Sequence, residues 1–120
     1  MKPKWQQRAR EIHERFLRLA QAKGTLHSDT EILNFLALAI CGEAGELANL
    51  VKKMWRGDDV AQEQLQEEIA DIRIYLEHLA RHLQIDLDRA CENKLDVVSE
   101  RLNAKEQEAA TSVASLSPPS

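Results

Sequence analysis

Four acidic residues, arranged in two pairs, are the side chains of this sequence best suited to chemistry. Glu43 and Glu46 are three residues apart, and so are Glu68 and Asp71. Residues at this spacing share one face of a helix, with Cβ atoms about 5–6 Å apart. Carboxylate oxygens are the ligands that hard divalent cations prefer. Two helices that face each other could therefore hold a divalent cation between the pairs.

The neighbours of one acid in each pair indicate that it points inward. Glu43 and Glu68 each occupy a position in a row that is otherwise apolar and has helical spacing. A charge that faces the core is costly unless it is paired or bound to a metal. This placement favours a metal site over a solvated acidic surface. The apolar members of the two rows are Leu36, Ile40, Leu47 and Leu50, and Leu65, Ile72, Leu76 and Leu79.

The acidic pairs are expected to lie within two of four helices. Aromatic residues make up only 4% of the chain and β-branched residues rarely cluster, so the sequence predicts an all-α fold. Gly24 should end the first helix, whose apolar stripe is expected to be Ile12, Phe16 and Leu19. The expected helices cover residues 4–23, 29–56, 60–83 and 87–105.

Capping residues support these helix boundaries. Ser28 and Glu31 fit a capping box at the start of the second helix. Asp58 or Asp59 is expected to cap the third helix and Asp86 the fourth. The short turn before Asp86 predicts antiparallel packing of the third and fourth helices.

The length of 120 residues suggests a single domain. We expect a helical catalytic domain over residues 1–106 and a flexible C-terminal tail over 107–120, because the tail has little apolar surface to bury. The second helix carries apolar residues around much of its circumference, and such a helix needs partners on several sides. A four-helix bundle assembled as a homodimer or homotetramer would provide them.

Charge and hydropathy exclude some classes of partner. The net charge of −4 argues against binding a nucleic acid polymer. The absence of an apolar run long enough to span a bilayer, and of a signal peptide, predicts a cytoplasmic protein without a membrane segment. Cys41 and Cys91 are expected to be small buried packing residues. The four histidines, His13, His27, His78 and His82, are interpreted as surface residues.

The acidic segments resemble the MazG-like nucleotide pyrophosphohydrolases. Residues 41–48 read CGEAGELA and residues 65–72 read LQEEIADI, which together match the family signature of Glu-x-x-Glu followed by Glu-x-x-Asp. The two motifs are separated by 21 residues. The resemblance covers roughly residues 30–102 and is strongest to the short dCTP-pyrophosphatase-like branch.

This resemblance implies an all-α oligomer that hydrolyses a nucleoside triphosphate to the monophosphate and pyrophosphate. It implies that Mg²⁺, with Mn²⁺ as an alternative, is held by Glu43, Glu46, Glu68 and Asp71. Glu67 would orient or deprotonate water. Lys94 and Arg101 match positions that face phosphate, and Tyr75 matches an aromatic near the nucleotide.

The aromatic positions depart from the family pattern. Lys53 stands where the family has a tryptophan, and Trp55 follows two residues later. Trp5 is a further candidate for an aromatic that faces the base, although packing is the stronger interpretation. These departures leave the preferred base open. Two alternatives to the nucleotide pyrophosphohydrolase also stay open, namely a non-catalytic helical interaction module and a phosphoribosyl-ATP pyrophosphohydrolase.

Overall fold

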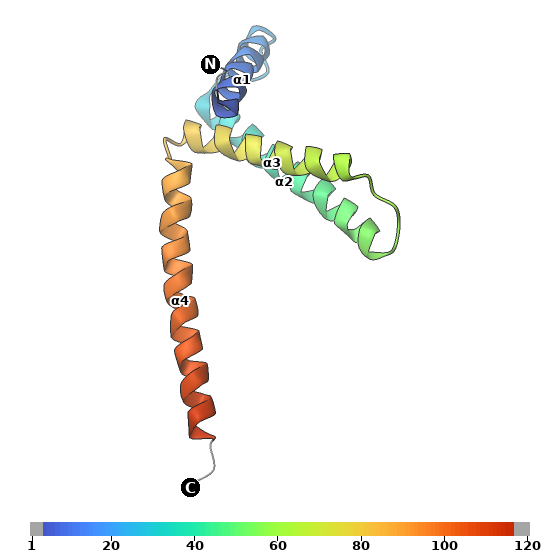
Figure 1. The fold of residues 1–120 in the computed structure, drawn as a ribbon. Helices are drawn as coiled ribbons and strands as arrows, with labels where there is room; N and C mark the ends of the chain where they lie inside the picture. Colours follow the sequence, from blue (N-terminus) through green and yellow to red (C-terminus); the bar gives the residue numbers. More distant parts are fainter. Residues whose placement is uncertain (1–3, 117–120) are drawn as a thin grey trace. The chain divides into compact units, whose positions relative to one another are not determined.

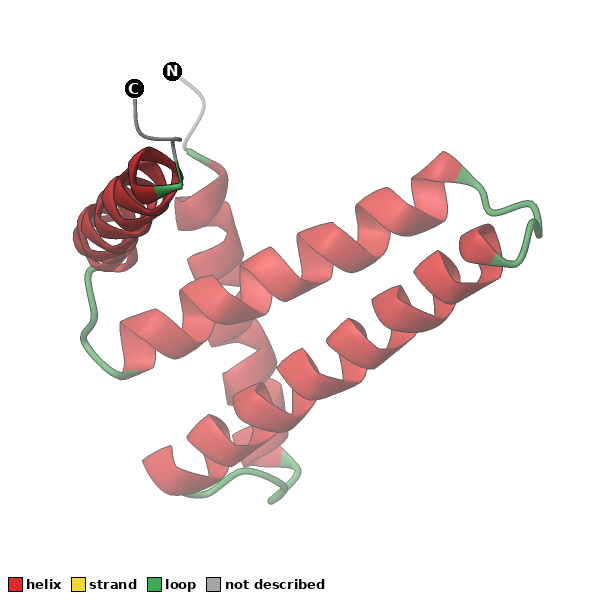
Figure 2. Ribbon diagram, turned by 90° about the horizontal axis from the view of Figure 1, so that it is seen from below, coloured by secondary structure: helices red, strands yellow, loops and turns green. Residues whose placement is uncertain are grey.

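The computed structural model describes residues 4–116, which contain four helices and no strand (Figures 1 and 2). This confirms the predicted all-α class. The helices are α1 (Trp5–Ala22), α2 (Asp29–Trp55), α3 (Gln62–His82) and α4 (Leu87–Ser115). They form two compact units that divide between Ile85 and Asp86, so that α1, α2 and α3 make one unit and α4 makes the other. The expected antiparallel packing of α3 and α4 therefore stays a prediction.

Local signals set the limits of α1 and α2 as expected. Gly24 adopts a positive φ of 75° just after α1, a conformation that glycine tolerates best. At the start of α2, the Ser28 hydroxyl accepts a hydrogen bond from the Glu31 amide at 3.2 Å. The Glu31 carboxylate accepts one from the His27 amide at 3.0 Å. Since these bonds satisfy amides that have no partner within the helix, they fix where α2 begins.

The predicted start of α3 is wrong by two residues. Its N-cap is Ala61, which makes no side-chain capping bond. Asp58 instead forms an ion pair with Arg56 at 3.1 Å, within the turn that joins α2 to α3. Asp58 lies three residues before the N-cap, too far along the chain to cap the helix that begins at Gln62.

The predicted start of α4 is confirmed, but its predicted end is wrong. Asp86 caps the helix by accepting a bond from the Arg89 amide at 3.1 Å. The helix continues past the expected residue 105 to Ser115, because residues 104–110 (AKEQEAA) are strong helix formers. The end of the predicted tail, residues 117–120, lies outside the described residues, and the domain limit at residue 106 stays a prediction.

The unit of α1, α2 and α3 is built on the contact between α2 and α3, which lie side by side in Figure 2, with α1 against α3. Leu36 is fully buried at this centre, and Ile32 is also buried. Other large apolar side chains of the α2–α3 pair remain exposed, including Leu38, Trp55 and Ile69. This unit therefore has a small core and a substantial apolar surface.

The cysteine prediction is wrong, because Cys41 and Cys91 are both exposed. Cys41 follows the half-buried Ile40 on α2, whose main packing partner within its unit is α3. In the part of the chain that the structure describes, none of the helices combines the length and the hydrophobicity needed to cross a membrane.

Candidate metal centre and adjoining cavities

Three of the four predicted ligands converge in the structure. Glu43 of α2 and Glu68 and Asp71 of α3 each offer a carboxylate oxygen, and these atoms lie within 4.8 Å of one another. Glu43 and Glu68 are half-buried, while Asp71 is exposed. The inward placement predicted for Glu43 and Glu68 is thus confirmed. It follows from the helical spacing, which places both residues on the faces through which α2 and α3 touch.

Glu46 lies beside this trio and is exposed. It is close enough to Glu68 that its charge and a side-chain hydrogen bond both raise the pKa of Glu68. Glu46 therefore extends the acidic cluster along α2, by one helical turn from Glu43. Glu43, Glu46, Glu68 and Asp71 are called the acidic cluster below.

Glu68 is the most perturbed member of the acidic cluster. Its pKa is raised from 4.5 to about 7. The largest cause is the closeness of the Glu43 carboxylate, to which a protonated Glu68 would donate a hydrogen bond, followed by burial and by the charge of Glu46. Among the described residues, no group hydrogen-bonds to its buried Oε2 atom. A buried carboxylate oxygen without a partner is unfavourable, and a coordinated cation would satisfy it. The acidic cluster therefore fits a hard divalent cation.

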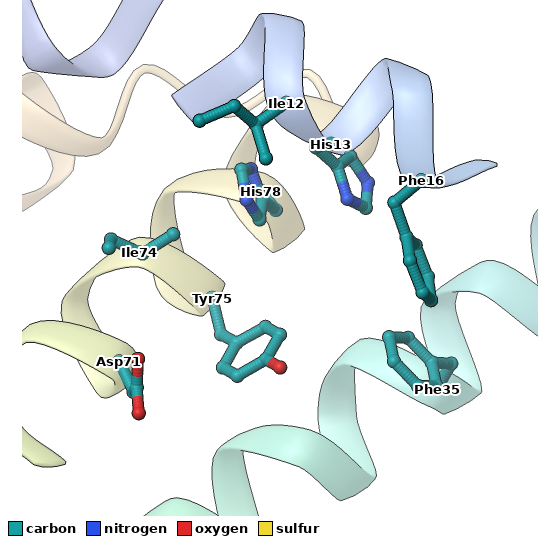
Figure 3. Close-up of a pocket in the computed structure, with 8 residues that line it drawn as sticks. All are labelled: Ile12, His13, Phe16, Phe35, Asp71, Ile74, Tyr75 and His78. Atoms are coloured by element: carbon teal, nitrogen blue, oxygen red, sulfur yellow. The ribbon is translucent and has the colours of Figure 1, made fainter. Parts of the chain in front are cut away.

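An apolar cavity of about 250 Å³ adjoins the acidic cluster at Asp71 (Figure 3). Tyr75 stands one turn after Asp71 on α3, and its pKa is raised by burial first and then by the charges of Glu43 and Asp71. Phe16 and Phe35, which both line the cavity, stack on each other with ring centroids 5.6 Å apart. The lining residues, which come from α1, α2 and α3, are Ile12, His13, Phe16, Phe35, Asp71, Ile74, Tyr75 and His78.

Two of these lining residues are stacked histidines. The rings of His13 and His78 lie 4.1 Å apart between centroids, and both residues are buried. The Arg81 guanidinium donates a hydrogen bond to Nδ1 of His78 at 2.7 Å. Because arginine has no acceptor, Nδ1 of His78 must be unprotonated. His13 in turn shares a 3.0 Å hydrogen bond between its Nε2 and that of His82.

The environment of the histidine stack keeps it neutral. Burial, followed by the charges of neighbouring histidines and of Arg81, lowers the pKa of both His13 and His78 to about 4. This wall of the apolar cavity is therefore uncharged at neutral pH. The prediction that the histidines lie at the surface is wrong for His13 and His78. Among the four histidines, only His27 is exposed.

His13 is buried because it lies on the packed face of α1. On α1, His13 and Ala20 are buried and Leu17 between them is half-buried, whereas the predicted stripe residues Ile12, Phe16 and Leu19 are exposed. The four- and three-residue steps from position 13 to position 20 are helical spacing. This spacing is present in the sequence, but hydropathy counts a histidine as polar and so hides the buried face.

A second, polar cavity of about 320 Å³ adjoins the acidic cluster at Glu46 and Glu68. The acidic cluster thus borders an apolar cavity through Asp71 and a polar cavity through these two residues. Both cavities lie within the unit of α1, α2 and α3. The residues that line the polar cavity are Glu46, Asn49, Leu50, Lys53, Gln64, Glu67 and Glu68.

The remaining predicted site residues are dispersed. Glu67 lines the polar cavity. Trp5 lies under the guanidinium of Arg73, which is 5.3 Å from its ring centroid, and it does not line the apolar cavity. Trp55, at the end of α2, is 88% exposed. Lys94 and Arg101 are exposed on α4, in the other unit, and their roles stay predictions.

The fold and the site define an all-helical protein with a carboxylate cluster suited to a hard cation. The model of the MazG-like family matches residues 26–114. The chain belongs to the MazG-like family. The match includes the whole acidic cluster but leaves out α1, which supplies His13 and Phe16 to the apolar cavity.

Individual relatives are similar over part of their length. The chain is 40% identical over 75 residues to dCTP pyrophosphatase 1 of Rattus norvegicus, a match that covers 55% of this chain and 43% of that protein. It is 38% identical over 78 residues to dCTP pyrophosphatase 1 of Homo sapiens, with 58% and 45% covered. It is 36% identical over 76 residues to the Gene 37 protein of Mycobacterium phage L5, with 59% and 67% covered. The matched segment therefore spans less than half of the mammalian proteins.

Proposed function

We propose that the protein is a Mg²⁺-dependent nucleoside triphosphate pyrophosphohydrolase, which converts a (deoxy)nucleoside triphosphate and water to the monophosphate and pyrophosphate. The observation that carries this proposal is the convergence of Glu43, Glu68 and Asp71 within 4.8 Å, beside an aromatic cavity. Similarity to dCTP pyrophosphatase 1 and membership of the MazG-like family support the same reaction.

The proposed metal ligands are Glu43, Glu46, Glu68 and Asp71. The unpartnered Oε2 of Glu68 supports this assignment, because coordination would replace the missing hydrogen bond. When bound, a divalent cation supplies charge neutralisation at phosphate and lowers the pKa of coordinated water. Mn²⁺ offers similar chemistry and is the alternative ion.

The remaining chemistry is mostly positioning, as phosphoryl transfer requires. Glu67 follows the acidic cluster in sequence and lines the polar cavity, where it could orient water or accept a proton from it. Lys94 and Arg101 of α4 are proposed to contact the phosphates, as the matching positions of the MazG-like family do.

We assign the base to the apolar cavity. Its aromatic side chains, Tyr75, Phe16 and Phe35, provide the flat apolar contacts that a base stacks on. The neutral histidine stack adds no charge to this wall. The volume of about 250 Å³ is below the ~300–1,000 Å³ usual for drug-sized ligands and suits a single small ring system. Trp5 and Trp55, which do not line the cavity, become secondary candidates.

We further propose that the protein is a homodimer or homotetramer in the cytoplasm. Exposed apolar side chains on α2 and α3, such as Leu38 at 72% and Ile69 at 56% exposure, support assembly. Apolar residues that are exposed together on neighbouring helices commonly mark an interface.

A nucleotide panel tests the proposed reaction. Purified protein is incubated with the eight common ribo- and deoxyribonucleoside triphosphates and with phosphoribosyl-ATP, with Mg²⁺ or with EDTA. We expect pyrophosphate and a monophosphate from at least one nucleotide, and only with the metal. Release of inorganic phosphate and a diphosphate would indicate cleavage of a different bond.

Matched variants connect the panel to the site. Glu68→Gln should abolish pyrophosphate release, whereas Glu63→Gln, an exposed acid at the start of α3, should not change it. If no nucleotide in the panel is hydrolysed, the proposed function is wrong. If Glu68→Gln retains full turnover, the assignment of the acidic cluster is wrong.

A further inference from the structure

We propose that Lys53 binds the pyrophosphate half of the nucleotide in the polar cavity and so acts as a substrate-binding residue of this chain. The inference rests on the proposed function, since it assigns one part of the substrate to one of the two cavities. It adds a phosphate-binding cation within the unit that carries the acidic cluster.

The register of α2 brings Lys53 to the polar cavity. Glu46, Asn49 and Lys53 follow one another at three- and four-residue steps, so they share a face of the helix. All three line the cavity, and Gln64 of α3 lines it as well. The cavity thus offers an ammonium and two side-chain amides, all of which can donate hydrogen bonds to phosphate oxygens.

Charge makes Lys53 distinctive among these lining residues. Glu46, Glu67 and Glu68 would repel a polyphosphate, and a single divalent cation does not neutralise the whole acidic cluster. Lys53 is the one lysine or arginine among the residues that line either cavity. Within residues 4–116, the ion pairs are Arg10–Glu14, Arg56–Asp58 and Arg73–Glu77, so Lys53 is not engaged in one.

The order of the three features indicates which part of the nucleotide would meet Lys53. The apolar cavity suits the base, the acidic cluster suits the scissile phosphoanhydride, and the polar cavity lies on the side of Glu46 and Glu68. A nucleotide laid along this path places its β- and γ-phosphates in the polar cavity. Cleavage between the α- and β-phosphates would then leave pyrophosphate beside Lys53 and the monophosphate at the acidic cluster and the apolar cavity.

The neighbouring lysine provides a matched control. Lys52 is exposed on the same helix, carries the same charge and does not line the polar cavity. Lys53→Met and Lys52→Met therefore remove the same charge from adjacent positions. Lys53→Arg keeps the charge and tests whether a cation alone is sufficient.

The experiment measures product binding as well as turnover. Isothermal titration of the protein at saturating Mg²⁺ measures two dissociation constants. The first is that of pyrophosphate. The second is that of the nucleoside monophosphate formed from the nucleotide that is hydrolysed fastest in the panel. Loss of a charge-assisted hydrogen bond in a partly open site should weaken pyrophosphate binding by about tenfold in Lys53→Met. Monophosphate binding should stay within about twofold of wild type, Lys52→Met should change neither constant, and Lys53→Arg should restore most of the loss.

Three results would overturn the assignment of Lys53 while leaving the proposed hydrolysis intact. The first is wild-type pyrophosphate affinity in Lys53→Met, and the second is an equal loss in Lys52→Met, which would indicate a general effect of charge. The third is a loss confined to the monophosphate. Failure of the wild-type protein to hydrolyse any nucleotide would instead reject the proposed function, and this inference with it.

Discussion

Replacing His13 by phenylalanine should reduce the acid sensitivity of the fold. His13 is buried, stacks on His78 and has a pKa lowered to about 4. A phenylalanine would keep a ring in the stack but could not take up a proton. It would also lose the hydrogen bond to His82, so a modest loss of stability is expected at neutral pH.

The sign of the pH dependence follows from proton linkage. The folded state binds protons at His13 and His78 less readily than the unfolded state does, because both pKa values are lowered. The stability that they contribute is present above pH 6.5 and is lost as the pH falls towards 4. A decrease in pKa from 6.5 to about 4 corresponds to about 3 kcal/mol per histidine, at ~1.36 kcal/mol per pH unit.

The two contributions are not independent, because the charge of each ring would oppose protonation of the other. We therefore expect a loss of about 3–5 kcal/mol in the free energy of unfolding for the pair between pH 7 and pH 4. That is a large part of the ~5–15 kcal/mol that stabilises a typical domain. His13→Phe should remove roughly half of this loss.

The titration of Glu68 must be excluded from this comparison, because its effect on stability changes with pH in the opposite direction. Its pKa is raised to about 7, so in the metal-free protein its contribution to stability is present at low pH and is lost as the pH rises from 4.5 towards 7. The comparison is therefore made in a Glu68→Gln background. His27→Phe, at an exposed histidine, serves as the matched control.

Urea denaturation followed by circular dichroism, at pH 7 and at pH 4, gives the free energies of unfolding. We expect a smaller difference between the two pH values in His13→Phe than in the Glu68→Gln parent or the His27→Phe control. If His13→Phe, the Glu68→Gln parent and the His27→Phe control lose the same free energy of unfolding on acidification, the histidine stack is not the source of acid sensitivity.

Four further outcomes are expected. Glu46→Gln should lower turnover on the order of 100-fold or more with an unchanged circular dichroism spectrum, since it removes a proposed ligand and no packing. Lys94→Ala should lower kcat/KM roughly 10- to 150-fold, and equally for every accepted base, because a phosphate contact does not read the base. Light scattering at micromolar concentration should give a multiple of the 13.6 kDa chain mass, because apolar residues of α2 and α3 need cover. Truncation after Glu108 should leave the rate per site within about twofold, because the described residues beyond it are exposed.

Each of these outcomes has a clear contrary result. Near-normal turnover of Glu46→Gln at saturating Mg²⁺ would remove Glu46 from the ligand set. A loss restricted to one base would move Lys94 to the base pocket, and no loss would make it a surface residue. An active monomer would refute the assembly, and a large effect of truncation would mean that the end of α4 covers a site or an interface.

The acidic cluster could be predicted from sequence because its geometry is local. The three-residue spacing fixes which residues share a helical face, and the surrounding apolar row shows that this face is turned inward. Convergence of the two pairs also requires that the helices carrying Glu43 and Glu68 face each other. The short connection between α2 and α3 makes that arrangement the simplest one.

The histidine stack could not be predicted from the same periodicity. Hydropathy treats a histidine as polar and therefore predicts that the stripe with the largest apolar side chains forms the core face of α1. In the fold, a ring from α3 stacks on His13, and His82 satisfies its Nε2. With these partners a neutral histidine packs like an aromatic residue. Both partners lie more than 60 positions away along the chain, where a local pattern carries no information about them.

The polar cavity shows a different limit of sequence reasoning. Lys52 and Lys53 are adjacent and chemically identical, so composition and charge cannot rank them. The two lysines are separated by about 100° around the helix, and only Lys53 shares the face of Glu46 and Asn49 that lines the polar cavity. The helical register was available from the sequence, but the presence of a cavity at that face was not, since it depends on how α3 lies against α2. The contact between α2 and α3 that buries Oε2 of Glu68 therefore also forms the polar cavity that distinguishes Lys53 from Lys52.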